Sequence, residues 1–325
     1  MRHRPPKNKE RFCWLRGPIR SKFPRRVKAI LSITFLAATL AAGGAPVVAP
    51  GATLQKLTGD FKFTEGPTCD AHGNIFFTDQ PNDRIMEWSV DGKLSTFLQP
   101  AGRANGMMFD ARGNLIACAE AKNEMWSIAP DKTVTVLATN FSGNILNGPN
   151  DVWVTPGGAL YFTDPFYKRS WGDPNAVRVS GENVYFLSAD RNTLRPVITN
   201  FKKPNGITGT PDGKKLFVAD IRANKTWRYD ILPDGALTNK TLFCPNGSDG
   251  MTIDAAGNLY LCATGTTNGV SVFDPQGKQI DHIDVPERWS ANVSFGGPDH
   301  QTLFITASES LYSIRLRVRG ANPAK

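Results

Sequence analysis

The chain has 325 residues, of which 40% are hydrophobic and 21% charged, with 30 Gly and 23 Pro. This composition is typical of a folded, turn-rich protein and excludes a disordered or collagen-like chain. The formal net charge of +9 arises at one end, because residues 1–42 carry eleven of the 38 Lys and Arg and one of the 29 Asp and Glu. The remainder has 27 basic and 28 acidic residues and a net charge of −1, so we expect no nucleic-acid partner.

The basic start leads into an uncharged apolar segment of fourteen residues, 29–42, followed by small residues. This segment is shorter than a membrane-spanning helix, and the order of basic, apolar and small residues is typical of a secretory signal. We predict that residues 1–49 are a signal peptide and leader, cleaved near residues 42–52. The protein is then exported, periplasmic or extracellular, with no stable membrane insertion after cleavage. An uncleaved membrane anchor is the alternative, and Arg25-Arg26 leaves a Tat route open.

Six related segments follow the leader. Each has a short apolar strand, a tight turn rich in Asp, Pro, Gly or Asn, and a second apolar strand, which is the pattern of a β-hairpin. The turn residues that mark them are Gly73, Gly113, Gly158, Gly213, Gly257 and His300. Successive spacings are 40, 45, 55, 44 and 43 residues, with two further short strands after each complete hairpin. The repeats predict an all-β fold, a six-bladed β-propeller with four antiparallel strands per blade.

The last repeat lacks one strand. Residues 310–318 supply its third strand and only a short tail follows, whereas residues 53–57 precede the first hairpin. We therefore expect the N-terminal strand to join the last blade and close the ring, which removes free sheet edges. Residues 50–320 then form one propeller domain with the catalytic site, and residues 321–325 form a tail.

The exported part contains four cysteines, and an even number permits disulfides. Their spacing matches no disulfide scaffold and no metal knuckle. Cys118 and Cys262 lie within apolar, strand-like runs, so buried thiols are the expected state for these two.

A polar residue recurs eight positions before each turn marker. These residues are Glu65, Asn105, Asn150, Asn205, Asp249 and Asn292. The first strand of every propeller blade lines the central channel, so equivalent positions should meet at one mouth. Turn capping explains any single Asn or Asp, but it does not explain Glu65.

The two carboxylates of this ring would repel each other near a common axis unless a cation lies between them. All the candidate donors are oxygens, which favours a hard ion. The sequence therefore predicts one divalent cation, with Ca²⁺ as the first choice and Zn²⁺, Mn²⁺ or Mg²⁺ as alternatives.

The longest spacing between repeats comes from an insertion at residues 165–182 (PFYKRSWGDPNAVRVSGE). This loop follows a second strand, so it should overhang the mouth as a partial lid with aromatic and basic contacts for a ligand. An ordinary surface insertion is the alternative. The four His lie in the leader, at far-end turns or in an outer strand pair, so no Ser/His/Asp triad is expected at the mouth.

Four short motifs, in this order, resemble the SMP-30/gluconolactonase/LRE-like family over about residues 60–318. They are Glu65-Gly-Pro, Gly148-Pro-Asn-Asp151, Pro204-Asn-Gly206 and Ser248-Asp-Gly-Met251. The resemblance implies a metal-dependent lactonase in which Glu65, Asn205 and Asp249 are metal ligands and Asn150 is a further ligand or a substrate contact. It also implies that Asp249 is the catalytic acid/base and that Arg103 and Asn105 lie near the substrate.

The residue types agree with this chemistry. Opening a lactone ester needs a polarised carbonyl, which a cation supplies, and an activated water, which a carboxylate supplies. We expect an exported hydrolase that opens sugar lactones, with either Asp249 or a metal-bound hydroxide activating the water. The alternatives are an esterase or phosphotriesterase on the same site and a non-enzymatic propeller that binds a ligand or partner around a structural calcium ion.

Overall fold

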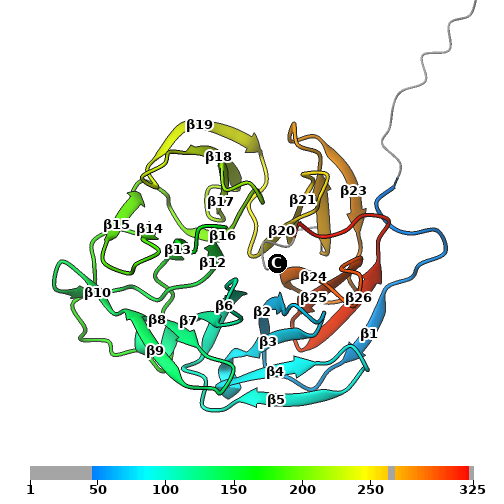
Figure 1. Ribbon diagram of the computed structural model, residues 1–325, viewed down its shortest axis with the longest axis horizontal. Helices are drawn as coiled ribbons and strands as arrows, with labels where there is room; N and C mark the ends of the chain where they lie inside the picture. Colours follow the sequence, from blue (N-terminus) through cyan, green and yellow to red (C-terminus); the bar gives the residue numbers. More distant parts are fainter. Residues whose placement is uncertain (1–45, 263–267, 322–325) are drawn as a thin grey trace, which may run out of the picture. The chain divides into compact units, whose positions relative to one another are not determined.

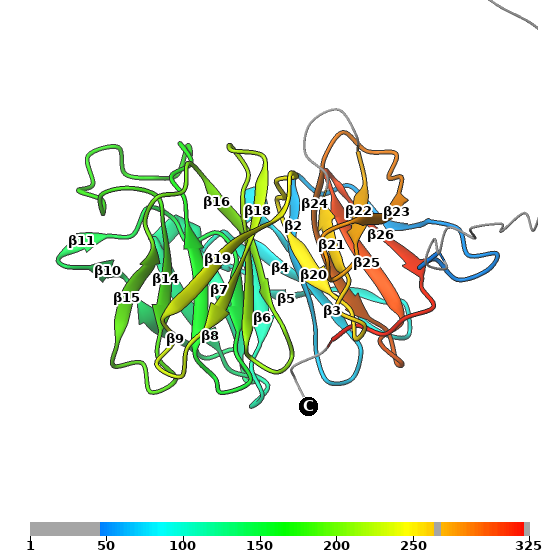
Figure 2. The same cartoon turned by 90° about the horizontal axis from the view of Figure 1, so that it is seen from above.

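The computed structural model describes residues 46–262 and 268–321. Six four-stranded antiparallel sheets surround a common axis (Figure 1), which confirms the predicted six-bladed β-propeller. Figure 2 shows it from the side, with the strands running between its two faces. Within these residues no helix is long and apolar enough to cross a membrane. Most of the predicted leader lies outside the described residues, so cleavage and export remain predictions.

The inner half of each blade consists of an innermost strand at the axis and a second strand beside it. The innermost strands are β2 (Thr64–Cys69), β6 (Ala104–Phe109), β12 (Val152–Val154), β16 (Pro204–Gly209), β20 (Met251–Ile253) and β24 (Ser290–Gly296). The second strands are β3 (Ile75–Asp79), β7 (Leu115–Ala119), β13 (Leu160–Asp164), β17 (Lys215–Asp220), β21 (Leu259–Cys262) and β25 (Thr302–Ala307). The second strands are almost entirely buried, because both faces pack against neighbouring blades, and this explains their continuous apolar sequence.

The outer half of each blade is increasingly exposed and polar. The third strands are β4 (Arg84–Trp88), β8 (Glu124–Ile128), β14 (Asn183–Leu187), β18 (Lys225–Ile231), β22 (Val270–Phe273) and β26 (Ser310–Arg315). The outermost strands are β5 (Leu94–Leu98), β9 (Val134–Ala138), β15 (Leu194–Ile198), β19 (Leu237–Cys244), β23 (Gln279–Ile283) and β1 (Gln55–Thr58). A small hairpin, β10 (Asn140–Phe141) and β11 (Asn144–Ile145), and two 3₁₀ turns, η1 (Gln80–Asn82) and η2 (Glu120–Lys122), complete the elements.

The two ends of the propeller meet in the sixth blade. Strand β1 pairs with β26 in the order β1-β26-β25-β24, which confirms the predicted closure by the N-terminal strand. The chain just outside these strands also packs on the propeller. Val47 is buried between the fifth and sixth blades, and the backbone N–H of Ala321 donates to the carbonyl of Ile253 in the fifth. The closure therefore extends beyond the paired strands.

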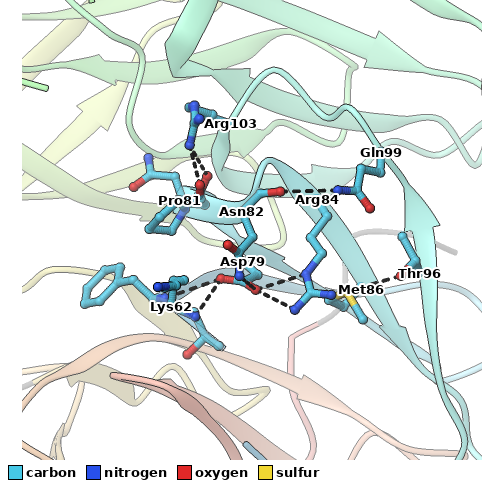
Figure 3. A network of polar contacts seen from close by, with 12 residues as sticks. Lys62, Asp79, Pro81, Asn82, Arg84, Met86, Thr96, Gln99 and Arg103 are labelled. Atoms are coloured by element: carbon cyan, nitrogen blue, oxygen red, sulfur yellow. Dashed lines mark hydrogen bonds and ion pairs between the residues drawn. The ribbon is translucent and has the colours of Figure 1, made fainter. Parts of the chain in front are cut away.

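A buried aspartate at the end of the second strand braces blades 1, 3 and 4. Each carboxylate accepts hydrogen bonds from the backbone N–H groups of the segment that leads into its blade. These bonds join Asp79 to Lys62 and Phe63, Asp164 to Asn147 and Gly148, and Asp220 to Lys202 and Lys203, as Figure 3 shows for Asp79 and Lys62. The braced segments lead into predicted site residues. The hydrogen bonds therefore fix the position of the backbone just before those residues.

All four cysteines of the described chain are buried and free. Cys118 and Cys262 have no exposed surface, which confirms the buried thiols predicted for them. Burial raises the pKa of both thiols well above the usual range, since a thiolate there would lose its hydration.

Candidate active site

Five of the six recurring polar residues line one cavity of about 770 Å³ at the mouth of the propeller. They are Glu65, Asn105, Asn150, Asn205 and Asp249. In each of these five blades, the ring residue lies four residues before the last paired residue of the innermost strand, next to the hairpin turn. The pairing of the first two strands therefore holds all five residues at the same height along the propeller axis. The rest of the lining is Phe63, Phe166, Tyr167, Lys168, Arg169, Glu182, Lys203, Ile221, Arg222 and Trp289.

The sixth predicted ring residue, Asn292, does not line this mouth cavity. In the last blade the hairpin contains one additional residue pair, Gly296 with Thr302. Counting eight residues back from the turn therefore reaches a residue that is one position nearer to the turn than the ring residues of the other blades. The equivalent of Asn150 is Ala291: its carbonyl accepts from Gly250 N–H at 2.7 Å, as the Asn150 carbonyl accepts from Gly106 N–H at 2.7 Å. The ring therefore has five polar members and one apolar member, and Asn292 lines a smaller axial cavity below it.

Glycines after the ring residues let neighbouring innermost strands approach closely. A Cβ on Gly206 would lie 2.4 Å from the carbonyl oxygen of Asp249, and a Cβ on Gly66 would lie 2.0 Å from that of Asn105. Gly66 also has a positive φ of 47°, which L-residues with side chains rarely adopt. In the Glu-Gly, Asn-Gly and Asp-Gly pairs, the first residue thus supplies a side-chain oxygen to the ring. The glycine allows the close backbone contact that brings the next ring residue near.

The buried carboxyl groups of the site destabilise one another's charged forms. Burial raises the pKa of Glu65 well above its usual range, and the nearby charge of Asp249 raises it further. Burial also raises the pKa of Asp249 to about 6, although hydrogen bonds from Trp289 and Asn205 oppose the shift. Asp151, one residue after Asn150, has a pKa raised by burial to about 7. The site therefore favours a positive charge among these oxygens.

Trp289 fixes the orientation of the Asp249 carboxylate. The indole Nε1–H donates to Oδ2 of Asp249 at 2.6 Å, and only 8% of the Asp249 residue surface is exposed. One lone pair of Oδ2 is taken by the indole, so the second lone pair of Oδ2 and both lone pairs of Oδ1 remain to accept a proton or to ligate an ion.

The donor set of the ring fits a hard divalent cation. Two carboxylates, Glu65 and Asp249, and the two amide oxygens of Asn150 and Asn205 line the same cavity, and such oxygens are the ligands that Ca²⁺ prefers. In residues 46–262 and 268–321, no group of three or more His, Cys, Asp and Glu side chains could hold a metal ion. Any site here thus depends on the asparagines as well as on the carboxylates.

The insertion at residues 165–182, between β13 and β14, contributes five residues to the cavity lining, as expected for a partial lid. The Tyr167 hydroxyl accepts a hydrogen bond from Asn205 Nδ2 at 3.0 Å. The Arg169 guanidinium pairs with the buried Glu120 of the second blade at 2.6 Å. Lys203 Nζ binds the Phe166 carbonyl at 2.6 Å. The insertion is therefore tied to blades 2 and 4 and to one of the ring amides.

Arg103 does not line the mouth cavity. Arg103 itself has a left-handed backbone conformation, with φ 48°. Its guanidinium donates to the Gln80 carbonyl and to the Pro81 carbonyl, the latter shown in Figure 3. The same guanidinium stacks on the Trp171 ring, with 4.6 Å between Cζ and the ring centroid. Its side chain thus supports the insertion, whereas the arginines that line the cavity are Arg169 and Arg222. Asn105, the other residue expected near the substrate, does line it.

Several cavity residues are ones that the sequence did not indicate. Trp289, Lys203 and Arg222 lie in segments between the repeating hairpins, where neither the spacing nor the polarity recurs from blade to blade. Lys203 directly precedes the Pro204-Asn-Gly206 motif, which was the only available signal for it. Trp289 had no comparable signal.

The chain is similar to known proteins over most of its length. The model of the SMP-30/Gluconolactonase/LRE-like region matches residues 63–309. A gluconolactonase of Zymomonas mobilis is 29% identical over 296 residues, 82% of each chain. A lactonase drp35 of Staphylococcus saprophyticus is 26% identical over 228 residues, covering 56% of this chain and 70% of the relative.

A solved structure of a gluconolactonase from Xanthomonas campestris superposes with a TM-score of 0.76 at 28% identity, covering 83% of this chain and 91% of the other. The residues matched by the family, 63–309, extend over nearly all of the propeller and include the five-residue polar ring. The chain therefore belongs to the SMP-30/gluconolactonase/LRE-like family.

Proposed function

We propose that this protein is an exported hydrolase that opens sugar lactones with the help of one divalent cation, Ca²⁺ being the first choice. The observation that carries the proposal is the Asp249 carboxylate, buried at the floor of the mouth cavity with one oxygen held by Trp289. Two lactone-hydrolysing relatives in the same family support it. The basic and apolar start of the chain supports export.

Glu65, Asn150, Asn205 and Asp249 are the residues that would hold the cation. When bound, the cation supplies Lewis-acid polarisation of the ring carbonyl of the lactone. Ca²⁺ accepts six to eight oxygen ligands, and these four side chains would not fill all of the positions. The remaining positions would be open to water or substrate. Asn105 lines the same cavity and can hydrogen-bond a sugar hydroxyl.

Asp249 would accept the proton of the attacking water at a carboxylate lone pair that neither Trp289 nor the cation uses. The Trp289 indole holds Oδ2, so the carboxylate cannot rotate freely to exchange its two oxygens. The same group, once protonated, returns the proton to the ring oxygen that leaves as a hydroxyl, which completes the addition of water across the ester bond. The insertion at residues 165–182 covers part of the mouth and reduces the access of bulk water.

The proposal is tested with purified protein, a panel of sugar lactones and simple esters, and metal analysis before and after chelator treatment. We expect lactone hydrolysis that the chelator abolishes and that added Ca²⁺ or another divalent ion restores. Asp249→Asn and Glu65→Gln should each lose this activity while keeping the far-UV circular dichroism of the wild type. N-terminal sequencing of the protein from a native host tests the cleavage near residues 42–52.

The panel also separates the competing functions. Faster turnover of open-chain esters or phosphotriesters than of any lactone would favour an esterase or phosphotriesterase. Strong stabilisation by Ca²⁺ without turnover of any lactone or ester would contradict the proposal and favour a binding propeller.

A further inference from the structure

The mouth cavity is lined by four basic side chains in a protein whose folded part is nearly neutral. Four cations line it, namely Lys168, Arg169, Lys203 and Arg222, against three carboxylates, Glu65, Glu182 and Asp249. Residues 43–325 as a whole carry a net charge of −1. With Glu120, which pairs with Arg169, the acidic groups equal the basic ones in number, so the cations differ in whether each has a partner.

Two of the four cations are already neutralised. Arg169 pairs with Glu120 at 2.6 Å, and Lys203 pairs with Glu182 at 3.0 Å and with the Phe166 carbonyl. Lys168 and Arg222 are exposed, and neither forms an ion pair in residues 46–262 and 268–321. These two charges are available to a ligand.

Lys168 and Arg222 lie on one side of the cavity. Lys168 belongs to the insertion of the third blade, and Arg222 lies two residues after the end of β17 in the adjacent fourth blade. Trp289, which binds Asp249, precedes the sixth blade. A ligand whose reactive carbonyl lies over the ring would therefore extend its distal end toward Lys168 and Arg222.

The cavity has room for such an extension. Its volume of about 770 Å³ lies in the upper part of the ~300–1,000 Å³ range of small-molecule pockets. A neutral monosaccharide lactone would leave both cations without a partner, whereas a ligand with a distal anion would bind them. Arginine suits carboxylate and phosphate oxygens because its guanidinium donates two parallel hydrogen bonds.

We propose that Lys168 and Arg222 form an anion subsite at the rim, and that the substrate is a sugar lactone carrying a second, negatively charged group. A carboxylate, a phosphate or a sulfonate shares this chemistry. The inference rests on the proposed lactonase function and specifies the substrate class for the same site.

The test compares kcat/KM for a neutral hexonolactone and for the same lactone carrying a terminal carboxylate, phosphate or sulfonate. We expect at least one charged lactone to exceed the neutral one about tenfold at low salt, with the advantage falling as ionic strength rises. Arg222→Gln and Lys168→Gln should each reduce the charged-to-neutral ratio about fivefold, mainly through KM. Arg112→Gln and Lys214→Gln remove cations from hairpin turns at the opposite face and should leave the ratio unchanged.

Binding of gluconate and glucarate to the protein, measured by calorimetry, gives a readout that does not depend on turnover. Tighter binding of the dianion, lost in Arg222→Gln, supports the subsite even if no lactone is hydrolysed, an outcome that would overturn only the lactonase function. If the neutral lactone is hydrolysed and no charged lactone is preferred, the subsite is wrong and the lactonase function stands. Equal binding of the two sugar acids in every variant also overturns the subsite.

Discussion

The indole N–H of Trp289 donates to Oδ2 of Asp249 at 2.6 Å, across the junction between the fifth and sixth blades. This bond opposes the effect of burial on the pKa of Asp249, because it stabilises the charged carboxylate. The bond also makes the two carboxylate oxygens of Asp249 different from each other, whereas the two oxygens of a fully solvated carboxylate are equivalent. The orientation of the proposed catalytic group therefore depends on a residue outside the repeating hairpins.

Trp289→Phe keeps the aromatic ring and removes the donor. A hydrogen bond to a charged group contributes about 1.5–3 kcal/mol, so kcat for lactone hydrolysis should fall by roughly tenfold to a hundredfold. KM should change less, because the ring and the cavity shape remain. Steady-state kinetics on the two enzymes measures both quantities.

Trp126→Phe is the matched control. Trp126 Nε1–H donates to Glu124 Oε2 at 2.6 Å on the third strand of the second blade, so the same type of bond is removed away from the cavity. This variant should keep the wild-type kcat. An equal loss in both variants would mean that the Trp289 effect is one of general stability.

Removal of the cation should destabilise the folded protein. Without an ion, Glu65 and Asp249 lie buried in the lining of one cavity, and the charge of Asp249 raises the pKa of Glu65. Saturating Ca²⁺, at a hundred times its dissociation constant, should add about 2.7 kcal/mol to the free energy of unfolding, and a chelator should remove that gain. Scanning calorimetry with and without the ion measures the shift of the unfolding temperature.

Glu65→Gln provides the internal comparison for the cation effect. It removes one of the two buried carboxylates, so the metal-free variant should unfold at a higher temperature than the metal-free wild type. Its response to Ca²⁺ should be much smaller. An unfolding temperature of the wild type that no divalent cation changes would argue against a cation in this ring.

Much of the fold and five members of the ring could be predicted from the sequence, because five hairpins share the same count between turn and ring. Asn292 was wrongly predicted to belong to the ring. One additional residue pair, Gly296 with Thr302, moves the turn one position farther from the ring without changing the local sequence pattern. Trp289 and Arg222 could not be predicted, because they lie where the chain passes between hairpins and neighbouring blades do not repeat one another. Arg103 was expected near the substrate but contacts Trp171, and only the three-dimensional packing of the insertion reveals this.

Gly206→Ala should damage the site through the backbone. The added Cβ would lie 2.4 Å from the carbonyl oxygen of Asp249, so the segment that carries Asp249, just before β20, has to move. Overpacking of this kind costs about 1–3 kcal/mol, and displacement of a catalytic group by about 1 Å can reduce kcat/KM by about a hundredfold. Gly157→Ala is the control, because the nearest atom to its Cβ is 3.9 Å away. Denaturant unfolding and lactone kinetics should separate the two variants.

Asp79→Ala should be the most destabilising of these substitutions, although Asp79 does not line the cavity. The carboxylate has no exposed surface, accepts from Lys62 N–H at 2.9 Å and Phe63 N–H at 3.4 Å, and pairs with Arg84 at 2.8 Å. Its removal leaves two backbone donors and a guanidinium without their acceptor, at a cost of about 3 kcal/mol or more in the free energy of unfolding.

The control for Asp79 is Asp274→Ala, whose carboxylate also accepts two backbone hydrogen bonds, from Gln276 and Lys278, but in an exposed turn. Water can replace that acceptor, so the cost should stay near or below 1 kcal/mol. Urea unfolding curves measure both losses. Because the segment braced by Asp79 leads directly into Glu65, the surviving folded fraction of Asp79→Ala should also bind the cation more weakly than wild type. Equal stability losses in the two variants would show that the brace contributes no more than an ordinary turn.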